Sequence, residues 1–178
     1  MENQRVRLTK QLLQESLMQL LKKEDINKIS VSEICKNAQI NRSTFYRYYG
    51  SQYELLNDVE MNILTQIETY LNEDSQTSDL SKMYIMLTFF EERREHYYLL
   101  LNNTVDEGFP EKLMNLPAVK SQMLDLLNEK YNPDEVEYLY ALIVKSGFEM
   151  IKKWLNKEQR ESPAQMAGFI ENTIQKLL

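Results

Sequence analysis

Apolar residues recur every three or four positions along the first part of the chain. They include Leu8, Leu12, Leu13, Leu17, Leu20 and Leu21. This spacing is typical of the apolar face of an amphipathic helix, so we predict a helix that ends near Lys23. The residues Ser30-Val31-Ser32-Glu33 follow, and they form a capping box in which Ser30 caps a helix and Glu33 reaches back. We therefore predict a second helix over residues 31–38.

A third helix is expected over residues 42–49, because Asn41 is the next strong N-cap candidate and a turn of three or four residues precedes it. Phe45 and Tyr49 fall on one side of this helix. Its remaining arc carries Arg42, Ser43, Thr44, Tyr46, Arg47 and Tyr48. A second capping box at residues 51–54, with Gly50 as a hinge before it, predicts a fourth helix whose apolar positions continue to Leu71.

Two short helices joined by a tight turn make a helix-turn-helix, in which the second helix enters the major groove of DNA. Arg42 and Ser43 lie at the end of that helix that meets base edges. Arginine can donate two hydrogen bonds to guanine, and the hydroxyls of Thr44, Tyr46 and Tyr48 can bond phosphate oxygens. The alternative is that this helix only solvates the surface, but a cluster of exposed aromatic residues is unusual there.

The rest of the chain also has a helical pattern, after a polar link at residues 72–78. Helices are predicted over residues 80–94, 95–103, 109–129 with an interruption near Pro117, 132–156 and 162–177. Only four glycines and four prolines occur, which is too few for the turns of a sandwich or barrel. We predict an all-α protein with a helix-turn-helix domain over residues 1–57 and a helical regulatory and dimerisation domain over residues 58–178.

Charge is distributed unevenly between these two parts. The net charge of −6 taken alone argues against a nucleic-acid partner, since the phosphate backbone attracts Lys and Arg. Residues 1–57, however, carry nine Lys/Arg and six Asp/Glu, which leaves a net charge of +3 there and −9 on the remainder. The asymmetry favours a small module that faces DNA, attached to a body that does not.

Cysteine content and hydropathy indicate the compartment. The single cysteine, Cys35, cannot form an intramolecular disulfide, and the N-terminus lacks the apolar stretch of a signal peptide. No segment approaches the roughly eighteen apolar residues that a membrane helix needs. These observations predict a cytoplasmic protein without a membrane partner.

The residues 29–38 and 40–49, followed by Glu54-Leu55-Leu56, resemble the DNA-binding domain of TetR-type transcriptional regulators. The resemblance covers about a third of the chain. It implies that residues aligned with Arg42 and Ser43 approach bases, that those aligned with Thr44, Tyr46 and Tyr48 approach phosphates, and that those aligned with Ile34, Ile40, Phe45 and Tyr49 are core. Residues 95–101, and residues 147–155 followed by Ser162-Pro163, are more loosely similar to regulatory domains of TetR-type proteins from low-GC Gram-positive bacteria, which implies a surface for a sensed molecule or a partner.

Two positions depart from the family pattern. Gln39 stands where the family has a glycine, at a turn position where a positive φ is convenient, so glutamine there either costs some strain or shifts the turn. Gln52 stands where the family has a lysine that contacts phosphate. The predicted DNA-binding residues are Ser30, Arg42, Ser43, Thr44, Tyr46, Arg47, Tyr48 and Gln52. The predicted function is a regulator, a repressor, that binds a palindromic double-stranded operator as a homodimer and responds to a small-molecule or protein effector.

A few other residues could support binding or chemistry. The candidates for an apolar effector cavity are Met83, Met86, Phe89, Phe90, Tyr97, Tyr98 and Phe109, which are also ordinary core residues of a helical bundle. His96 is the only histidine and no Cys/His cluster accompanies it, so a metal site is not expected, and no cofactor is predicted. Cys35 is interpreted as a small buried hydrophobe, and the charged run at residues 91–95 as a solvated face. No motif of an enzyme is present.

The last two helices are predicted to form the dimer interface, as a four-helix bundle with their twofold mates. The candidate contact residues are Gly147, Phe148, Ile151, Phe169 and Ile170. The alternative is that these side chains are buried within their own subunit. The alternative function for the whole chain is a helical protein-interaction module without DNA binding, which predicts no affinity for a duplex.

Overall fold

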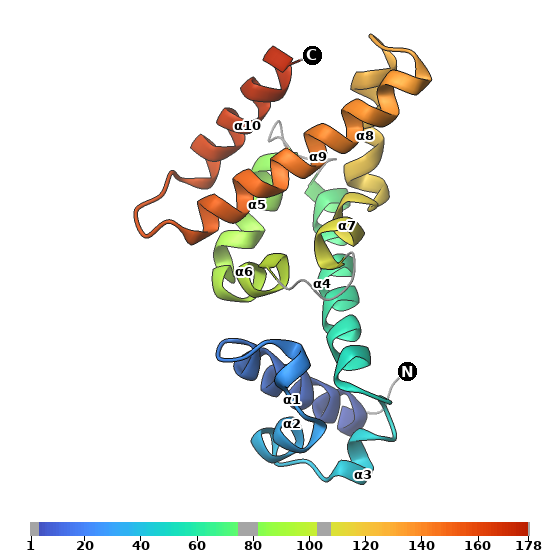
Figure 1. The fold of residues 1–178 in the computed structure, drawn as a ribbon, viewed down its shortest axis with the longest axis vertical. Coiled ribbons are helices and arrows are strands. Elements are labelled where there is room, and N and C mark those ends of the chain that lie inside the picture. Colours follow the sequence, from blue (N-terminus) through green and yellow to red (C-terminus); the bar gives the residue numbers. More distant parts are fainter. Residues whose placement is uncertain (1–3, 75–81, 103–107, 178) are drawn as a thin grey trace. The chain divides into compact units, whose positions relative to one another are not determined.

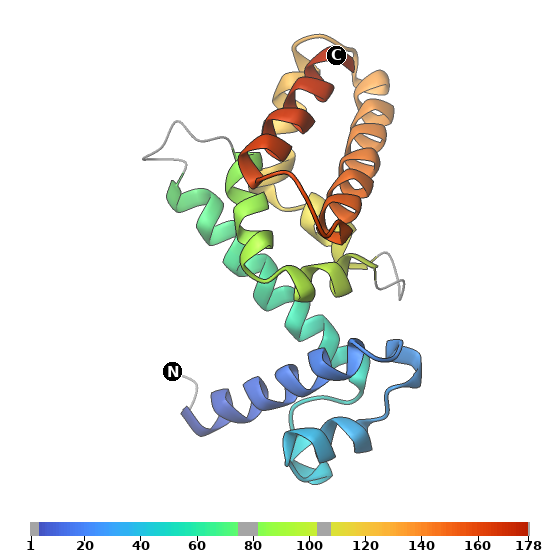
Figure 2. The same ribbon diagram turned by 90° about the vertical axis from the view of Figure 1, so that its left-hand side faces the viewer.

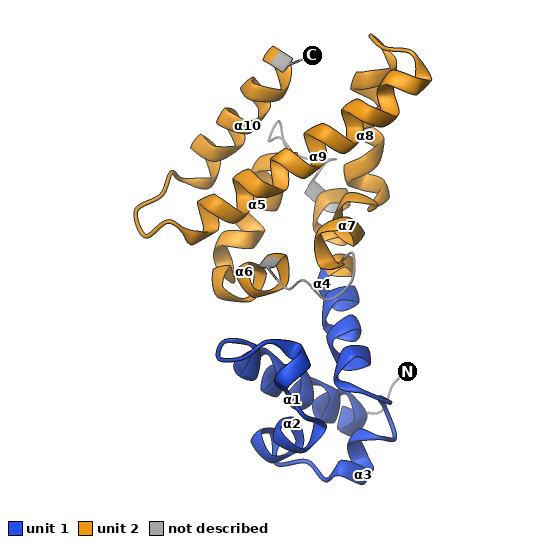
Figure 3. Ribbon diagram, viewed as in Figure 1, with its two compact units in different colours: residues 1–63 blue, residues 64–178 orange. Residues whose placement is uncertain are grey.

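The computed structural model describes residues 4–74, 82–102 and 108–177, and within these ranges it contains helices and no strand (Figure 1). The all-α prediction is thus confirmed. The chain divides into two compact units, residues 1–63 and 64–178 (Figure 3). The division falls inside one long helix, six residues beyond the predicted limit at residue 57.

Unit 1 is a small helical domain. Its elements are α1 (Gln4–Leu21), the 3-10 turn η1 (Ile26–Lys28), α2 (Val31–Ala38), α3 (Arg42–Phe45) and the first part of α4 (Gln52–Asp74). The fully buried side chains at its centre are Leu13, Leu17, Ile26, Ile34, Phe45 and Leu55. Helix α1 packs against α2, and Leu13 and Leu17 of the leucine stripe that predicted α1 are fully buried, whereas Leu8 and Leu12, nearer its beginning, are 55% and 36% exposed.

The capping box at the start of α2 forms as predicted. The Ser30 hydroxyl accepts from the Glu33 amide at 3.2 Å, and Glu33 Oε2 accepts from the Ser30 amide at 2.8 Å. The helix ends at Gln39, whose backbone is left-handed with φ 56° and ψ 36°. A positive φ at this position was expected from the family pattern, and a side chain there costs about 1–2 kcal/mol.

Helix α3 is shorter than predicted, since it ends at Phe45 and not at Tyr49. The amides of Arg47 and Tyr48 donate to the carbonyls of Thr44 and Phe45, three residues back, at 3.3 and 2.9 Å. The chain thus continues in tighter turns after one α-helical turn. Asn41 occupies the N-cap position, as predicted, but its side chain makes no capping hydrogen bond.

The junction before α4 is a modified capping box. The amide of Glu54 donates to the Ser51 hydroxyl at 3.3 Å, whereas Glu54 Oε2 accepts from the amide of Gly50 at 2.7 Å. The carboxylate thus reaches one residue further back than the predicted box requires. A Cβ at position 50 would lie 2.9 Å from Glu54 Oε1, so glycine permits this close approach.

Unit 2 is a bundle of helices (Figure 2). After the end of α4 it contains α5 (Lys82–Glu92), α6 (Arg94–Asn102), α7 (Gly108–Met114), α8 (Pro117–Asn128), α9 (Pro133–Asn156) and α10 (Pro163–Leu177). Helix α9 packs against α6 and α8, and α10 packs against α5. Pro117, Pro133 and Pro163 each stand at the first position of a helix, where no amide hydrogen is needed. The predicted interruption near Pro117 is therefore confirmed, but it separates two helices, α7 and α8, and Pro117 begins the second of them.

The connection between α9 and α10 is bonded to the corner between α5 and α6. Arg94 Nε donates to the carbonyl of Leu155 at 2.5 Å, and its Nη2 donates to that of Lys157 at 3.0 Å. Arg160 pairs with Glu91 through two hydrogen bonds. The interpretation of residues 91–95 as a solvated face was therefore wrong for Glu91 and Arg94, because both hold another segment of unit 2 in place.

Candidate functional site

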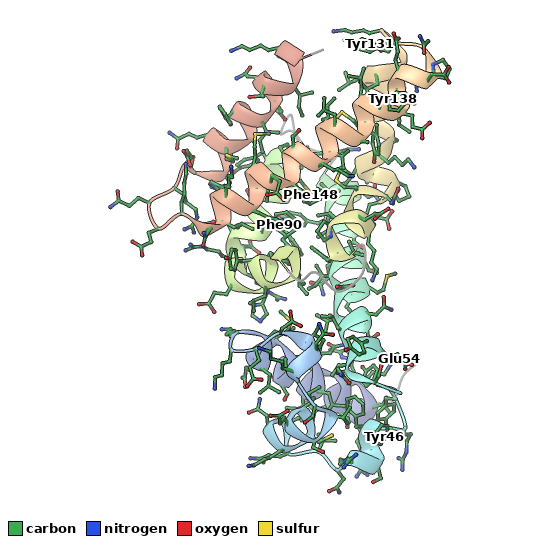
Figure 4. The ribbon with its side chains drawn as sticks, in the orientation of Figure 1. Tyr46, Glu54, Phe90, Tyr131, Tyr138 and Phe148 are labelled. Atoms are coloured by element: carbon green, nitrogen blue, oxygen red, sulfur yellow. The ribbon has the colours of Figure 1, made fainter. Side chains whose placement is uncertain are left out.

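The first turn of α3 presents polar side chains to solvent over a buried aromatic anchor. Arg42 and Ser43 are exposed directly after the N-cap, while Phe45 is fully buried. Tyr46, at the end of α3, is 50% exposed (Figure 4). Its ring meets the Phe45 ring edge-on with 5.6 Å between centroids. The buried residue thus fixes the helix while its neighbours remain available to a ligand.

Arg42 and Tyr46 face each other one helical turn apart. Arg42 Nη2 donates to the Tyr46 hydroxyl at 3.4 Å, and the guanidinium carbon lies 5.9 Å from the centroid of the Tyr46 ring. The hydrogen bond from Arg42 to Tyr46 raises the pKa of the guanidinium further above its ordinary value. This long, exposed contact can be exchanged for a bond to a base edge or a phosphate, because arginine has five donors.

The other predicted DNA-binding residues differ in how available they are. Arg47 is exposed, and Thr44, Tyr48 and Gln52 are half-buried, Gln52 at the first position of α4. Ser30 is exposed, but its hydroxyl donates to Glu33 Oε2 at 2.7 Å while it accepts the Glu33 amide. A bond from the Ser30 hydroxyl to phosphate would therefore have to replace the one to Glu33.

A polar cluster that the sequence did not reveal holds the end of this segment. Asp58 Oδ2 on α4 accepts from the Tyr49 hydroxyl at 2.6 Å and from the Gln14 amide of α1 at 2.9 Å. Tyr49 itself is only 5% exposed. Three parts of unit 1 therefore meet at one carboxylate. The one sequence feature that could have indicated this cluster is Asp58 itself, a charged residue directly before the apolar position Val59.

Unit 2 contains a hollow with a cavity volume of about 280 Å³. Its lining residues are Leu71, Lys82, Met83, Met86, Val119, Met123, Leu126, Glu171, Ile174 and Gln175. Met83 and Met86 belong to the set predicted for an effector cavity. The other lining residues come from α4, α8 and α10, which the sequence pattern did not connect with this segment.

The remaining candidates for the effector cavity do not line this hollow. Tyr97 packs against Phe90 and Phe89, with ring centroids 4.8 and 5.5 Å apart, and Phe109 is fully buried. Burial raises the pKa of the Tyr97 hydroxyl well above its ordinary range. Tyr98 is half-buried. The aromatic residues of this set mainly fill the interior of unit 2.

The residues predicted for the dimer interface are mostly buried within the protomer. Phe148, Ile151 and Ile170 are at most 7% exposed, because they face the inside of unit 2. Gly147 is half-buried, and a Cβ added there would meet nothing within 4 Å. Phe169 on α10, by contrast, is 58% exposed.

Two large side chains on α9 are exposed, which the sequence pattern did not predict. Tyr138 is 77% exposed and Leu142, one turn later, is 58% exposed (Figure 4 labels Tyr138 and Phe148). They lie on the opposite face of α9 from Ile143 and Ile151. Both belong to a helix whose apolar positions exceed one face, so periodicity alone did not separate inner from outer positions.

The structure also bears on metal and membrane sites. Across the described ranges, no group of three His, Cys, Asp or Glu side chains is placed to hold a metal ion. Among the described helices, none combines the length and apolarity needed to cross a membrane.

Cys35 is buried, and burial raises the pKa of its thiol, although Arg42 acts in the opposite direction.

Comparison with known proteins agrees with this geometry. A model of the C-terminal region of transcriptional regulators matches residues 79–176, more than half of the chain, and a model of bacterial regulatory proteins of the tetR family matches residues 15–59. An uncharacterized helix-turn-helix type transcriptional regulator of Bacillus subtilis (strain 168), YxbF, is 23% identical over 167 residues, which are 85% of this chain. The chain spans 40% of the length of that relative.

Solved structures share the fold over nearly the whole chain. A TetR transcriptional regulator from Streptococcus agalactiae 2603V is 21% identical with a TM-score of 0.72, and the match covers 96% of this chain and 95% of that one. The fatty acid degradation regulator FadR from Bacillus halodurans is 13% identical with a TM-score of 0.65, covering 93% and 94% of the two chains. This chain belongs to the TetR family of transcriptional regulators.

Proposed function

We propose that the chain binds a palindromic double-stranded operator as a homodimer, represses transcription there, and is released by an effector. The observation that carries the DNA-binding part is the first turn of α3. Arg42 and Ser43 are exposed there, while Phe45 and Tyr49 are buried beneath them. A helix fixed by its inner residues and polar at its N-terminal end suits insertion into the major groove.

The side chains around this turn divide into two roles. Arg42 and Ser43 read base edges, with Arg42 donating two hydrogen bonds to a guanine. The residues assigned to the DNA backbone are Thr44, Tyr46, Arg47, Tyr48 and Gln52. Ser30 is a weaker contact, because its hydroxyl already serves the α2 cap. The net charge of +3 on residues 1–57 supports the same orientation toward DNA.

Dimerisation supplies the second half-site. We assign the contact to the exposed apolar side chains Tyr138 and Leu142 of α9 and Phe169 of α10, which a twofold mate can cover. The double variant Leu142→Glu with Phe169→Glu should sediment as a monomer, because two buried carboxylates would meet their symmetry mates. Leu8→Glu, at a 55% exposed position in unit 1, is the matched control and should remain dimeric.

The experiment on DNA begins with selection of duplexes from a random library by the full chain. Fluorescence anisotropy then compares Arg42→Ala and Arg42→Lys on the selected duplex and on single-base variants of it. Both variants should relax the preference at one base pair in each half-site by about 1–3 kcal/mol, because both remove the bidentate hydrogen bond to the base. Arg42→Lys keeps the positive charge and therefore separates the loss of this contact from the loss of charge. Unchanged preferences at every position would remove Arg42 from base reading, and failure to select any sequence would favour a helical interaction module instead.

A further inference from the structure

The hollow in unit 2 opens to solvent, because two of its lining residues, Leu126 and Gln175, are exposed. Its cavity volume of about 280 Å³ is close to the lower end of the range of roughly 300–1,000 Å³ that is usual for small-molecule pockets. Three methionine side chains line it, Met83 and Met86 from α5 and Met123 from α8. Thioether side chains adapt to the shape of what they contact. The lining can therefore adapt to apolar molecules of different shapes.

Two opposite charges interrupt these apolar walls. Lys82 is contributed by α5 and Glu171 by α10, and both are half-buried. Lys82 Nζ donates to the carbonyl of Ala118 at 3.4 Å, the long end of the hydrogen-bond range. Within the described part of the chain, neither Lys82 nor Glu171 forms an ion pair. A donor and an acceptor are thus both available to a molecule in the hollow.

We propose that this hollow binds a small apolar molecule with one uncharged polar head, such as a primary amide, that accepts from Lys82 and donates to Glu171. A carboxylate head would be attracted by Lys82 but repelled by Glu171. An ammonium head would be attracted by Glu171 but repelled by Lys82. At about 30 Å³ per water-sized group, the cavity holds about nine non-hydrogen groups. This assignment deepens the effector part of the proposed function and rests on it for any regulatory consequence.

Helix α10 connects the hollow with the proposed dimer contact. Glu171 and Ile174 on α10 line it, and Phe169 on the same helix is exposed at the surface assigned to the twofold mate. A ligand that moves α10 therefore changes how two protomers meet. Such a ligand biases the dimer toward one spacing of its two DNA-binding units, provided that it binds the two arrangements with different affinity.

The test uses three eight-carbon probes of nearly equal size: octanamide, octanoate and octylamine. Isothermal titration calorimetry on the full chain at pH 7, without DNA, should show octanamide binding about tenfold more tightly than either charged probe, since each of these loses a hydrogen bond to a charged group. Lys82→Met should shift the preference to octylamine, and Glu171→Gln should shift it to octanoate. Both substitutions are at half-buried polar positions, so the fold is retained.

Binding in the hollow is checked by Met86→Trp, which fills the cavity and should abolish binding of all three probes. Met123→Trp fills it from α8 and serves if the first variant fails to fold. Three outcomes overturn the proposal: equal affinity for the three probes, a preference that the two charge variants leave unchanged, or no binding of any probe. Because the titration contains no DNA, a failure of operator binding is a separate result and leaves this one intact.

Discussion

The polar cluster at Asp58 leads to the most quantitative prediction about unit 1. Tyr49→Phe removes the hydroxyl that donates to Asp58 Oδ2 at 2.6 Å and leaves the buried ring in place. The carboxylate keeps its hydrogen bond from Gln14 at 2.9 Å and lies in a half-buried position. The variant therefore removes one charge-assisted hydrogen bond without creating a large cavity.

The size of the effect follows from this geometry. A hydrogen bond to a charged group contributes about 1.5–3 kcal/mol to stability. The lower end applies here, because water reaches Asp58 and the Gln14 bond remains. We expect Tyr49→Phe to lower the free energy of unfolding by about 1.5 kcal/mol.

Urea unfolding followed by circular dichroism measures this change, and a double-mutant cycle with Asp58→Ala isolates the pair. We expect a coupling energy of about 1 kcal/mol, in the range for residues in direct contact. Fluorescence of Trp154, the single tryptophan, reports on unit 2 in the same samples. If the two single losses simply add in the double variant, the Tyr49 to Asp58 bond does not stabilise the domain and the reasoning fails.

Three further predictions concern unit 1. Gln39→Gly should raise the free energy of unfolding by about 1 kcal/mol, because φ is 56° there. The control Ala38→Gly, at the last position of α2, should lower the free energy of unfolding by up to about 1 kcal/mol, and a loss of stability at position 39 would contradict the strain argument. Cys35 should react with iodoacetamide far more slowly in the native protein than in urea, since burial raises its thiol pKa, and equal rates would contradict this. The Ser30 hydroxyl lowers the pKa of Glu33 in the folded state, so the capping box stabilises the protein above a pH of about 4.3, and this contribution is lost as the pH falls through the lowered pKa. Urea titrations should therefore show that Ser30→Ala lowers the free energy of unfolding more at pH 7 than at pH 3. An equal loss at both pH values would show that the Glu33 carboxylate does not contribute.

Local signals predicted the helix starts well. The capping box at Ser30 and the prolines at positions 133 and 163 act within one turn of the chain, so their consequences can be derived from a few residues. The same rule explains Pro117 in retrospect, because a proline costs nothing at the first position of a helix. Helix α3 was predicted too long because no local signal distinguishes its α-helical turn from the tighter turns that follow.

Longer-range features were less predictable. The contact of Asp58 with Tyr49 and Gln14 joins residues up to 44 positions apart, and no periodicity encodes such a pairing. The same holds for the hollow, where α5 meets α8 and α10. Helix α9 is apolar on more than one face, so the sequence identified it as an interface candidate but did not separate Phe148 on the inside from Tyr138 on the outside.

The central claim is that this regulator binds duplex DNA through the exposed turn of α3. Fluorescence anisotropy of the full chain against a selected duplex and a scrambled duplex, each at 50 and 200 mM salt, tests it most directly. The account predicts tighter binding to the selected duplex, an affinity for both that falls steeply with salt, and loss of the difference between them in Arg42→Ala. Equal affinity for the two duplexes that is independent of salt, or no affinity for either, would contradict it.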